Sequence, residues 1–138
     1  MTKREQHKYQ SYRELHNAHV EVAKSNQIEF NSGSETIKHA VAKLLVGYIG
    51  HTNGYWVSSE VDVPQGEIDV LLWGHESRLT YAVEVETGWT DTTLYDKTER
   101  YVHSVGPIDD IVPIEVTEMP INMIEATEWI SEQLGLTL

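Results

Sequence analysis

Two runs in the middle of the chain alternate apolar and polar residues in the manner of β-strands. Residues 66–73 and 81–87 are rich in β-branched, leucine and aromatic side chains, and the polar residues 74–77 between them supply a turn. Residues 55–63 show a similar pattern before a Pro-Gln-Gly turn, and residues 111–116 form a further run. The sequence therefore predicts four strands, the first three of which form a meander.

Helical spacing appears before, between and after these strands. Ser34 is a good N-cap for a helix that runs to residue 50, with core positions expected at Ile37, Val41, Leu44, Leu45 and Tyr48. Thr90 or Asp91 caps a second helix, which ends at Gly106-Pro107. A last helix opens at Pro120, with core positions expected at Met123, Ala126 or Thr127, Ile130 and Leu134. Residues 31–138 are thus predicted to form one α/β domain with a mixed sheet flanked by helices.

Charge divides the chain into two parts. The net charge is −12, yet residues 1–24 hold five basic and three acidic side chains, a balance of +2. Residues 1–30 are expected to form a polar arm or appendage, with a helix from about residue 9 to 23. An acidic body with a basic arm is typical of a protein from a salt-loving host, or of an arm that contacts an anionic partner, and the two are compatible.

The composition also excludes several classes of protein. The chain has no cysteine, which excludes a disulfide framework or a thiolate metal site and fits a reducing compartment. No apolar run approaches the roughly 18–20 residues of a membrane span. The polar N-terminus is unlike a secretory signal. We therefore expect a soluble intracellular protein without a membrane partner.

Carboxylates interrupt the two central strands. In a hairpin centred near residue 76, Asp69 lies almost opposite Glu84, and Glu86 is on the same face. Two carboxylates about 5 Å apart repel by roughly 3 kcal/mol at an effective dielectric of ~20. Such a cluster must take up protons or bind a cation, and it suits a hard divalent cation. The alternative is that these acids line a solvated face of the sheet.

This pattern resembles the PD-(D/E)XK restriction-endonuclease-like nuclease superfamily, to which archaeal Holliday-junction resolvases belong. The Gly-x-Ile-Asp-Val strand followed by Val-Glu-Val-Glu also resembles small nuclease-fold proteins of salt-loving archaea and their plasmids or viruses. The resemblance covers residues 34–136 and implies the order α-β-β-β-α-β-α. It further implies a homodimeric DNA endonuclease that uses Mg²⁺ or Mn²⁺ to hydrolyse phosphodiester bonds, including those of branched DNA.

The resemblance implies a role for each of the acidic residues. Asp69 would be the central metal ligand, and Glu84 and the backbone carbonyl of Val85 would complete the inner shell. Glu35, in the first helix of the domain, would help to hold a water or a second metal. Glu86 lies where most members carry a lysine that positions the attacking water and offsets charge on the phosphate.

A cation from the helix after the acidic strand could replace that lysine. Lys97 and Arg100 are the candidates, and Lys97 shares a helix face with Tyr101 at i,i+4. These side chains resemble a phosphate-contacting motif of some family members. His39, one turn after Glu35, could also contact a phosphate. The alternatives are a surface lysine paired with nearby acids and a partly exposed histidine without a role.

Two other functions stay open on the sequence alone. A nuclease-fold protein that has lost catalysis could bind nucleic acid or protein, and Glu86 in the lysine position favours this interpretation. A viral or plasmid accessory factor could use its acidic surface to bind a host protein. The three acids Asp69, Glu84 and Glu35 favour the nuclease, because a pure binding module has no need of clustered carboxylates.

Overall fold

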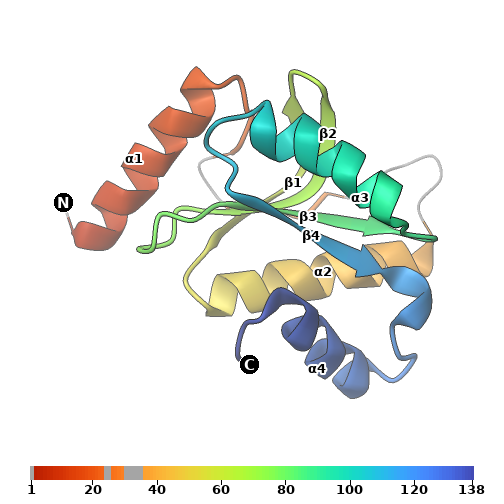
Figure 1. The fold of residues 1–138 in the computed structure, drawn as a ribbon. Helices are drawn as coiled ribbons and strands as arrows, with labels where there is room; N and C mark the ends of the chain where they lie inside the picture. Colours follow the sequence, from red (N-terminus) through yellow and green to blue (C-terminus); the bar gives the residue numbers. More distant parts are fainter. Residues whose placement is uncertain (1, 24–25, 30–35) are drawn as a thin grey trace.

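Four strands form one mixed β-sheet, and helices cover both of its faces (Figure 1). The computed structural model describes residues 2–23, 26–29 and 36–138. The strands lie side by side in the order β1 (Trp56–Val63), β2 (Gly66–Trp73), β3 (Tyr81–Glu86) and β4 (Asp110–Glu115). Neighbouring pairs are antiparallel except for β3 and β4, which are parallel. The predicted α/β class, with a mixed sheet flanked by helices, is confirmed.

The helices pack on the two faces of the sheet and form two buried clusters of apolar side chains with it. The helices in the described residues are α1 (Lys3–Asn17), α2 (Ile37–Thr52), α3 (Asp91–Thr98) and α4 (Met123–Leu134). A π-helical turn, Glu99–His103, follows α3, and a 3-10 turn, Val116–Glu118, follows β4. The first core lies between the sheet and α2 with α4, and the second lies between the sheet and α1 with α3. The domain therefore has three layers.

In β1 and β2, the alternation of side chains between the two faces of the sheet shifts by one residue at the same position. Val57 of β1 belongs to the first core, whereas Val61 belongs to the second, although a regular strand keeps residues of equal parity on one face. In β2, Val70 is in the first core and Ile68 in the second. The pairs Ser59↔Val70 and Val61↔Ile68 bracket Glu60 and Asp69. Glu60 has a φ of 48°, so its left-handed backbone accommodates the change of face.

α2 buries only part of the stripe that was expected: Leu45 is buried and Val41 packs against the first core, as predicted. Three of the five positions expected in the core are instead exposed, namely Ile37, Leu44 and Tyr48, and the buried apolar stripe is Ala42, Leu45, Val46 and Ile49. The reason is the close approach of the helix to the sheet, since a Cβ on Gly50 would lie 2.6 Å from Leu72 Cδ2. In α4, Ala126 and Ile130 are buried as expected, but Met123 is exposed.

α1 is packed on the sheet and does not stand off as an appendage. The helix begins at a capping box formed by Thr2 and Glu5, earlier than expected, and ends at Asn17. Leu15 is fully buried in the second core. Ser11 Oγ also accepts a hydrogen bond from the backbone N–H of Gly74. The N-terminal helix is therefore part of the same domain.

Leu15→Ala tests this packing. We expect it to lower the free energy of unfolding by about 2–4 kcal/mol, because it leaves a cavity between α1 and the sheet. Urea denaturation measures the change, with the exposed Gln6→Ala as the control at a cost of less than about 0.5 kcal/mol. Equal, small effects of the two substitutions would mean that α1 contributes little to the second core.

Candidate active site

Asp69 and Glu84 come from neighbouring strands, and the side chain of each accepts a backbone N–H from the other strand. The backbone N–H of Asp69 donates to Glu84 Oε2 at 2.9 Å, and the backbone N–H of Val85 donates to Asp69 Oδ2 at 2.8 Å. These bonds lie next to the last Cα pair of the antiparallel ladder, Val70↔Val83. The two side chains thus take the place of backbone partners, and the sequence prediction that they lie nearly opposite each other is confirmed.

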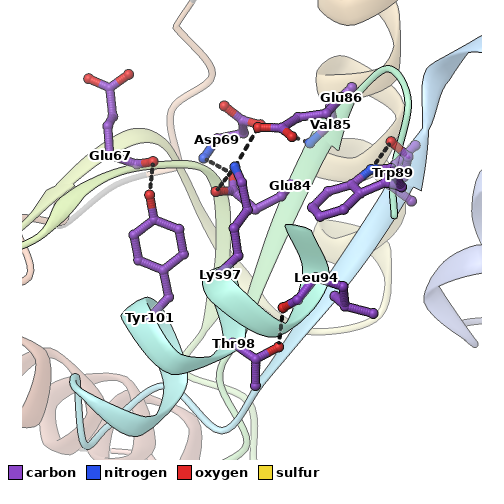
Figure 2. Close-up of polar contacts among 11 residues, drawn as sticks. Glu67, Asp69, Glu84, Val85, Glu86, Trp89, Leu94, Lys97, Thr98 and Tyr101 are labelled. Atoms are coloured by element: carbon purple, nitrogen blue, oxygen red, sulfur yellow. Dashed lines mark hydrogen bonds and ion pairs between the residues drawn. The ribbon is translucent and has the colours of Figure 1, made fainter. Parts of the chain in front are cut away.

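Lys97 reaches this pair from α3 (Figure 2). Its Nζ lies 3.1 Å from Glu84 Oε1 and 2.5 Å from Glu86 Oε1. The Thr90 side chain caps α3 by accepting the N–H of Thr93, which fixes the helix start directly after the acidic strand. The ammonium therefore stands between the two glutamates of β3, beside the carboxyl pair.

Burial and mutual repulsion decide the charge of the pair. Glu84 is 1 % exposed. Its burial, followed by the charge of Asp69, raises its pKa to about 8. Burial also raises the pKa of Asp69, and a side-chain hydrogen bond joins the two carboxyls. At neutral pH Glu84 therefore keeps its proton and shares it with Asp69.

Lys97 remains charged in this setting. Burial alone would lower its pKa, but the nearby carboxyls of Glu84 and Glu86 outweigh that effect and raise it. The Lys97 Nζ also lies 5.6 Å from the centre of the Trp89 ring. An ammonium that stays charged at neutral pH is thus held against Glu84 and Glu86, beside Asp69.

A second carboxyl pair lies where the side-chain alternation of β1 and β2 shifts from one face of the sheet to the other. Glu60 forms an ion pair with Lys43 of α2, which is 1 % exposed. The carboxyl of Glu67 is hydrogen-bonded to that of Glu60, and this bond, with burial and nearby acids, raises the pKa of Glu67 to about 7. Burial would raise the pKa of Glu60, but its bonds to Glu67 and Lys43 lower it.

Lys43 and Glu60 were not among the predicted site residues. A signal was available, because Lys43 interrupts an apolar stretch of α2 and a buried lysine requires a carboxylate partner. The electrostatic influence of Glu60 on Asp69 connects the two carboxyl pairs across β1, β2 and β3. The site is therefore broader than the three acids that were predicted.

The other predicted residues lie further from the carboxyl pair or outside the described structure. Glu35 lies outside the described residues. Tyr101 is 3 % exposed and its hydroxyl donates to the carbonyl of Glu67, so its expected contact with nucleic acid is corrected to a packing role. The Nζ of Lys97 lies 6.0 Å from the centre of the Tyr101 ring, so the two side chains are neighbours, as their i,i+4 spacing predicts. Arg100 is exposed over the ring of Tyr101, and His39 binds Thr36 Oγ1 at the start of α2.

Residues 36–138, together with 2–23 and 26–29, contain no group of three or more His, Cys, Asp or Glu side chains arranged to hold a metal ion. In the same residues, no helix combines the length and apolar character needed to cross a membrane. The chain matches no protein-family model, no curated protein and no solved structure. Its function is therefore argued from the geometry of Asp69, Glu84 and Lys97.

The proton held by Glu84 makes the stability of the protein depend on pH. The pKa is raised in the folded state, so folding retains a proton that the unfolded chain releases above about pH 4.5. Stability therefore falls as the pH rises from about 4.5 to about 8. Glu84→Gln removes this dependence, and we expect it to gain on the order of 1–2 kcal/mol relative to wild type over that range.

Urea denaturation at several pH values measures this effect. Glu67→Gln is the matched control, because Glu67 has a raised pKa as well but is exposed. It should flatten the pH profile far less than Glu84→Gln. If both variants kept the wild-type profile, Glu84 would be ionised in the folded protein.

Proposed function

We propose that this protein is a metal-dependent DNA endonuclease with a PD-(D/E)XK, restriction-endonuclease-like fold. The observation that carries the proposal is the contact of a buried Asp69–Glu84 pair with the ammonium of Lys97. The parallel pairing of β3 and β4 around α3, after an antiparallel meander, supports the same fold.

The donor set suits Mg²⁺ or Mn²⁺. Magnesium takes oxygen ligands, keeps several waters and needs only one or two carboxylates from a protein. Asp69 and Glu84 would hold the ion, with the carbonyl of Val85 and with Glu35 as the further ligands that the family resemblance suggests. The shared proton on the pair marks a place where positive charge is favoured. When bound, a divalent cation supplies a Lewis acid for a phosphate oxygen and lowers the pKa of water.

Lys97 provides the positive charge that Glu86 cannot. In most family members the residue at the Glu86 position is a lysine, whereas here an acid at that position binds the Nζ of Lys97. Glu86 is the more exposed of the two glutamates that Lys97 contacts, so the ammonium lies toward the open side of the pair. From there it would orient the attacking water or offset charge on the scissile phosphate.

The surface charge and the expected assembly complete the proposal. A net charge of −12 supports an intracellular protein of a salt-loving host, whose salt screens the repulsion among surface acids. A homodimer would supply the second active site needed to cut both strands of DNA. We include branched DNA among the proposed substrates because the sequence resembles junction resolvases.

The second candidate function is a nuclease-fold factor that binds nucleic acid or protein without cutting. Glu86 favours it, since it occupies the lysine position and its ion pair holds Lys97 in place. In that case the Asp69–Glu84 pair keeps its shared proton and has no need of a cation. The two functions differ in their response to divalent metal.

Cleavage of labelled single-stranded, duplex, flap and four-way-junction DNA with Mg²⁺, Mn²⁺ or EDTA tests the proposal. We expect metal-dependent cutting at low or molar salt, its loss in Asp69→Asn, and wild-type cutting in Gln133→Glu, on the exposed surface of α4. Isothermal titration should find that Asp69→Asn also loses its affinity for Mn²⁺. A folded wild-type protein that cuts none of these substrates would support the binding factor instead.

A charge swap tests the role of Lys97. Lys97→Glu should lower the cleavage rate by about 10²–10³-fold, because it removes the one donor that faces both glutamates of β3. Adding Glu86→Lys to Lys97→Glu returns an ammonium to the same ion pair and should recover at least ten-fold of that loss. A double variant no faster than Lys97→Glu would contradict the role given to the ammonium.

A further inference from the structure

Basic side chains gather on α1 and on the turn between β2 and β3. Half of the chain's ten lysines and arginines lie there, namely Lys3, Arg4, Lys8, Arg13 and Arg78. Arg4, Arg13 and Arg78 are exposed. In the part of the chain that the structure describes, none of these three forms an ion pair with a carboxylate. The same segments also hold Glu5, Glu14 and Glu76, so their balance is +2, which makes them a local positive surface on a protein with a net charge of −12.

Aromatic rings support two of these arginines. Arg4 lies 5.7 Å from the centre of the Trp56 ring, and Lys8 Nζ lies 3.5 Å from the same ring. Arg13 lies 5.9 Å from the ring of Tyr9, one helical turn away. A guanidinium that stacks on a ring keeps its in-plane N–H groups for a phosphate oxygen. The 55 % exposed ring of Tyr9 is also available to a base.

The turn and the helix are held together as one surface. His7 and Ser11 of α1 line a cavity of about 10 Å³ together with His75 and Arg78 of the turn. Such a volume accommodates about one water. The hydrogen bond from Gly74 N–H to Ser11 Oγ joins the same two segments. Arg78 therefore lies beside α1.

This surface and the candidate active site lie on the same side of the sheet. Leu15 of α1 and Leu94 of α3 both pack on the second core, so both helices cover that face (Figure 1). Trp56 pairs with Trp73, which lies four residues beyond Asp69 along β2. Four residues of a strand span about 13 Å. Along one strand of DNA, at about 3.4 Å per phosphate, this corresponds to about four nucleotides.

We propose that the exposed arginines of α1 and of the turn, Arg4, Arg13 and Arg78, bind the phosphate backbone of nucleic acid at a flank of the cleaved bond. Arg4 lies beside Trp56 of the sheet, and Arg13, half a helical revolution away, lies on the opposite side of α1, so the two arginines contact different phosphates. The naming of the polymer as DNA rests on the proposed function, whereas the binding itself requires neither metal nor catalysis. Arginines on exposed rings bind the backbone of any sequence, so this contact sets affinity and orientation and not base preference.

Binding of fluorescein-labelled DNA, measured by anisotropy in EDTA over a range of KCl concentrations in which the protein stays folded, tests the proposal. Arg4→Gln/Arg13→Gln should weaken binding at least several-fold and reduce the slope of log Kd against log salt by about 2, since each phosphate that the variant no longer binds accounts for about one unit. Arg4→Lys/Arg13→Lys keeps both charges and should keep the slope. Lys38→Gln/Gln133→Glu changes the net charge by the same amount on the exposed surfaces of α2 and α4 and should leave the slope unchanged.

The outcomes separate this proposal from the endonuclease. If the glutamine variant and the α2/α4 control lower the slope equally, only the net charge matters and the α1 surface is not a binding site. If wild type binds no DNA in EDTA, the proposal also fails, even if the protein cuts DNA with metal. If wild type binds with the expected slope but never cuts, the α1 surface stands and the endonuclease does not.

Discussion

The contact between Asp69 and Glu84 is the constraint on which the rest of the structure depends. Each carboxyl accepts a backbone N–H from the other strand, so the pair carries part of the sheet's own hydrogen bonding. Two buried carboxyls can stay this close only if they share a proton or face positive charge. Lys97 on α3 supplies that positive charge, and the nearby charge of Glu60 raises the pKa of Asp69, which favours the shared proton.

Two lysines from opposite layers offset the acidic residues. Lys43 of α2 binds Glu60, and Lys97 of α3 binds Glu84 and Glu86. Removing one partner of a buried ion pair typically costs about 3–5 kcal/mol, because the other charge is left without compensation. Each lysine therefore ties its helix to the acidic strands. The same charges that are favourable for a cation or a phosphate thus also fix the helical layers around the sheet.

Features that depend on local periodicity could be predicted from the sequence, whereas features that depend on tertiary packing could not. The alternation in residues 66–73 and 81–87 placed Asp69 beside Glu84, because hairpin register follows from turn position. The prediction of the buried face of α2 was right for Leu45 and wrong for Ile37, Leu44 and Tyr48, because two apolar stripes compete on that helix and close approach at Gly50 selects one of them. The left-handed Glu60 and the π-helical turn after α3 depend on tertiary contacts, so residue periodicity carried no signal for them.

The distribution of charge also limits how an anionic polymer can approach. The net charge of −12 repels such a polymer, while α1 and the turn with Arg78 carry an excess of basic side chains, and α1 lies on the side of the sheet that α3 covers. A long-range field of this kind orients an approaching polymer before any contact forms. Lys97 lies on that same side, at the carboxyl pair. In the complex that we propose, a polymer held by α1 would extend toward Asp69 and Lys97 and not toward α4, because that helix carries no lysine or arginine.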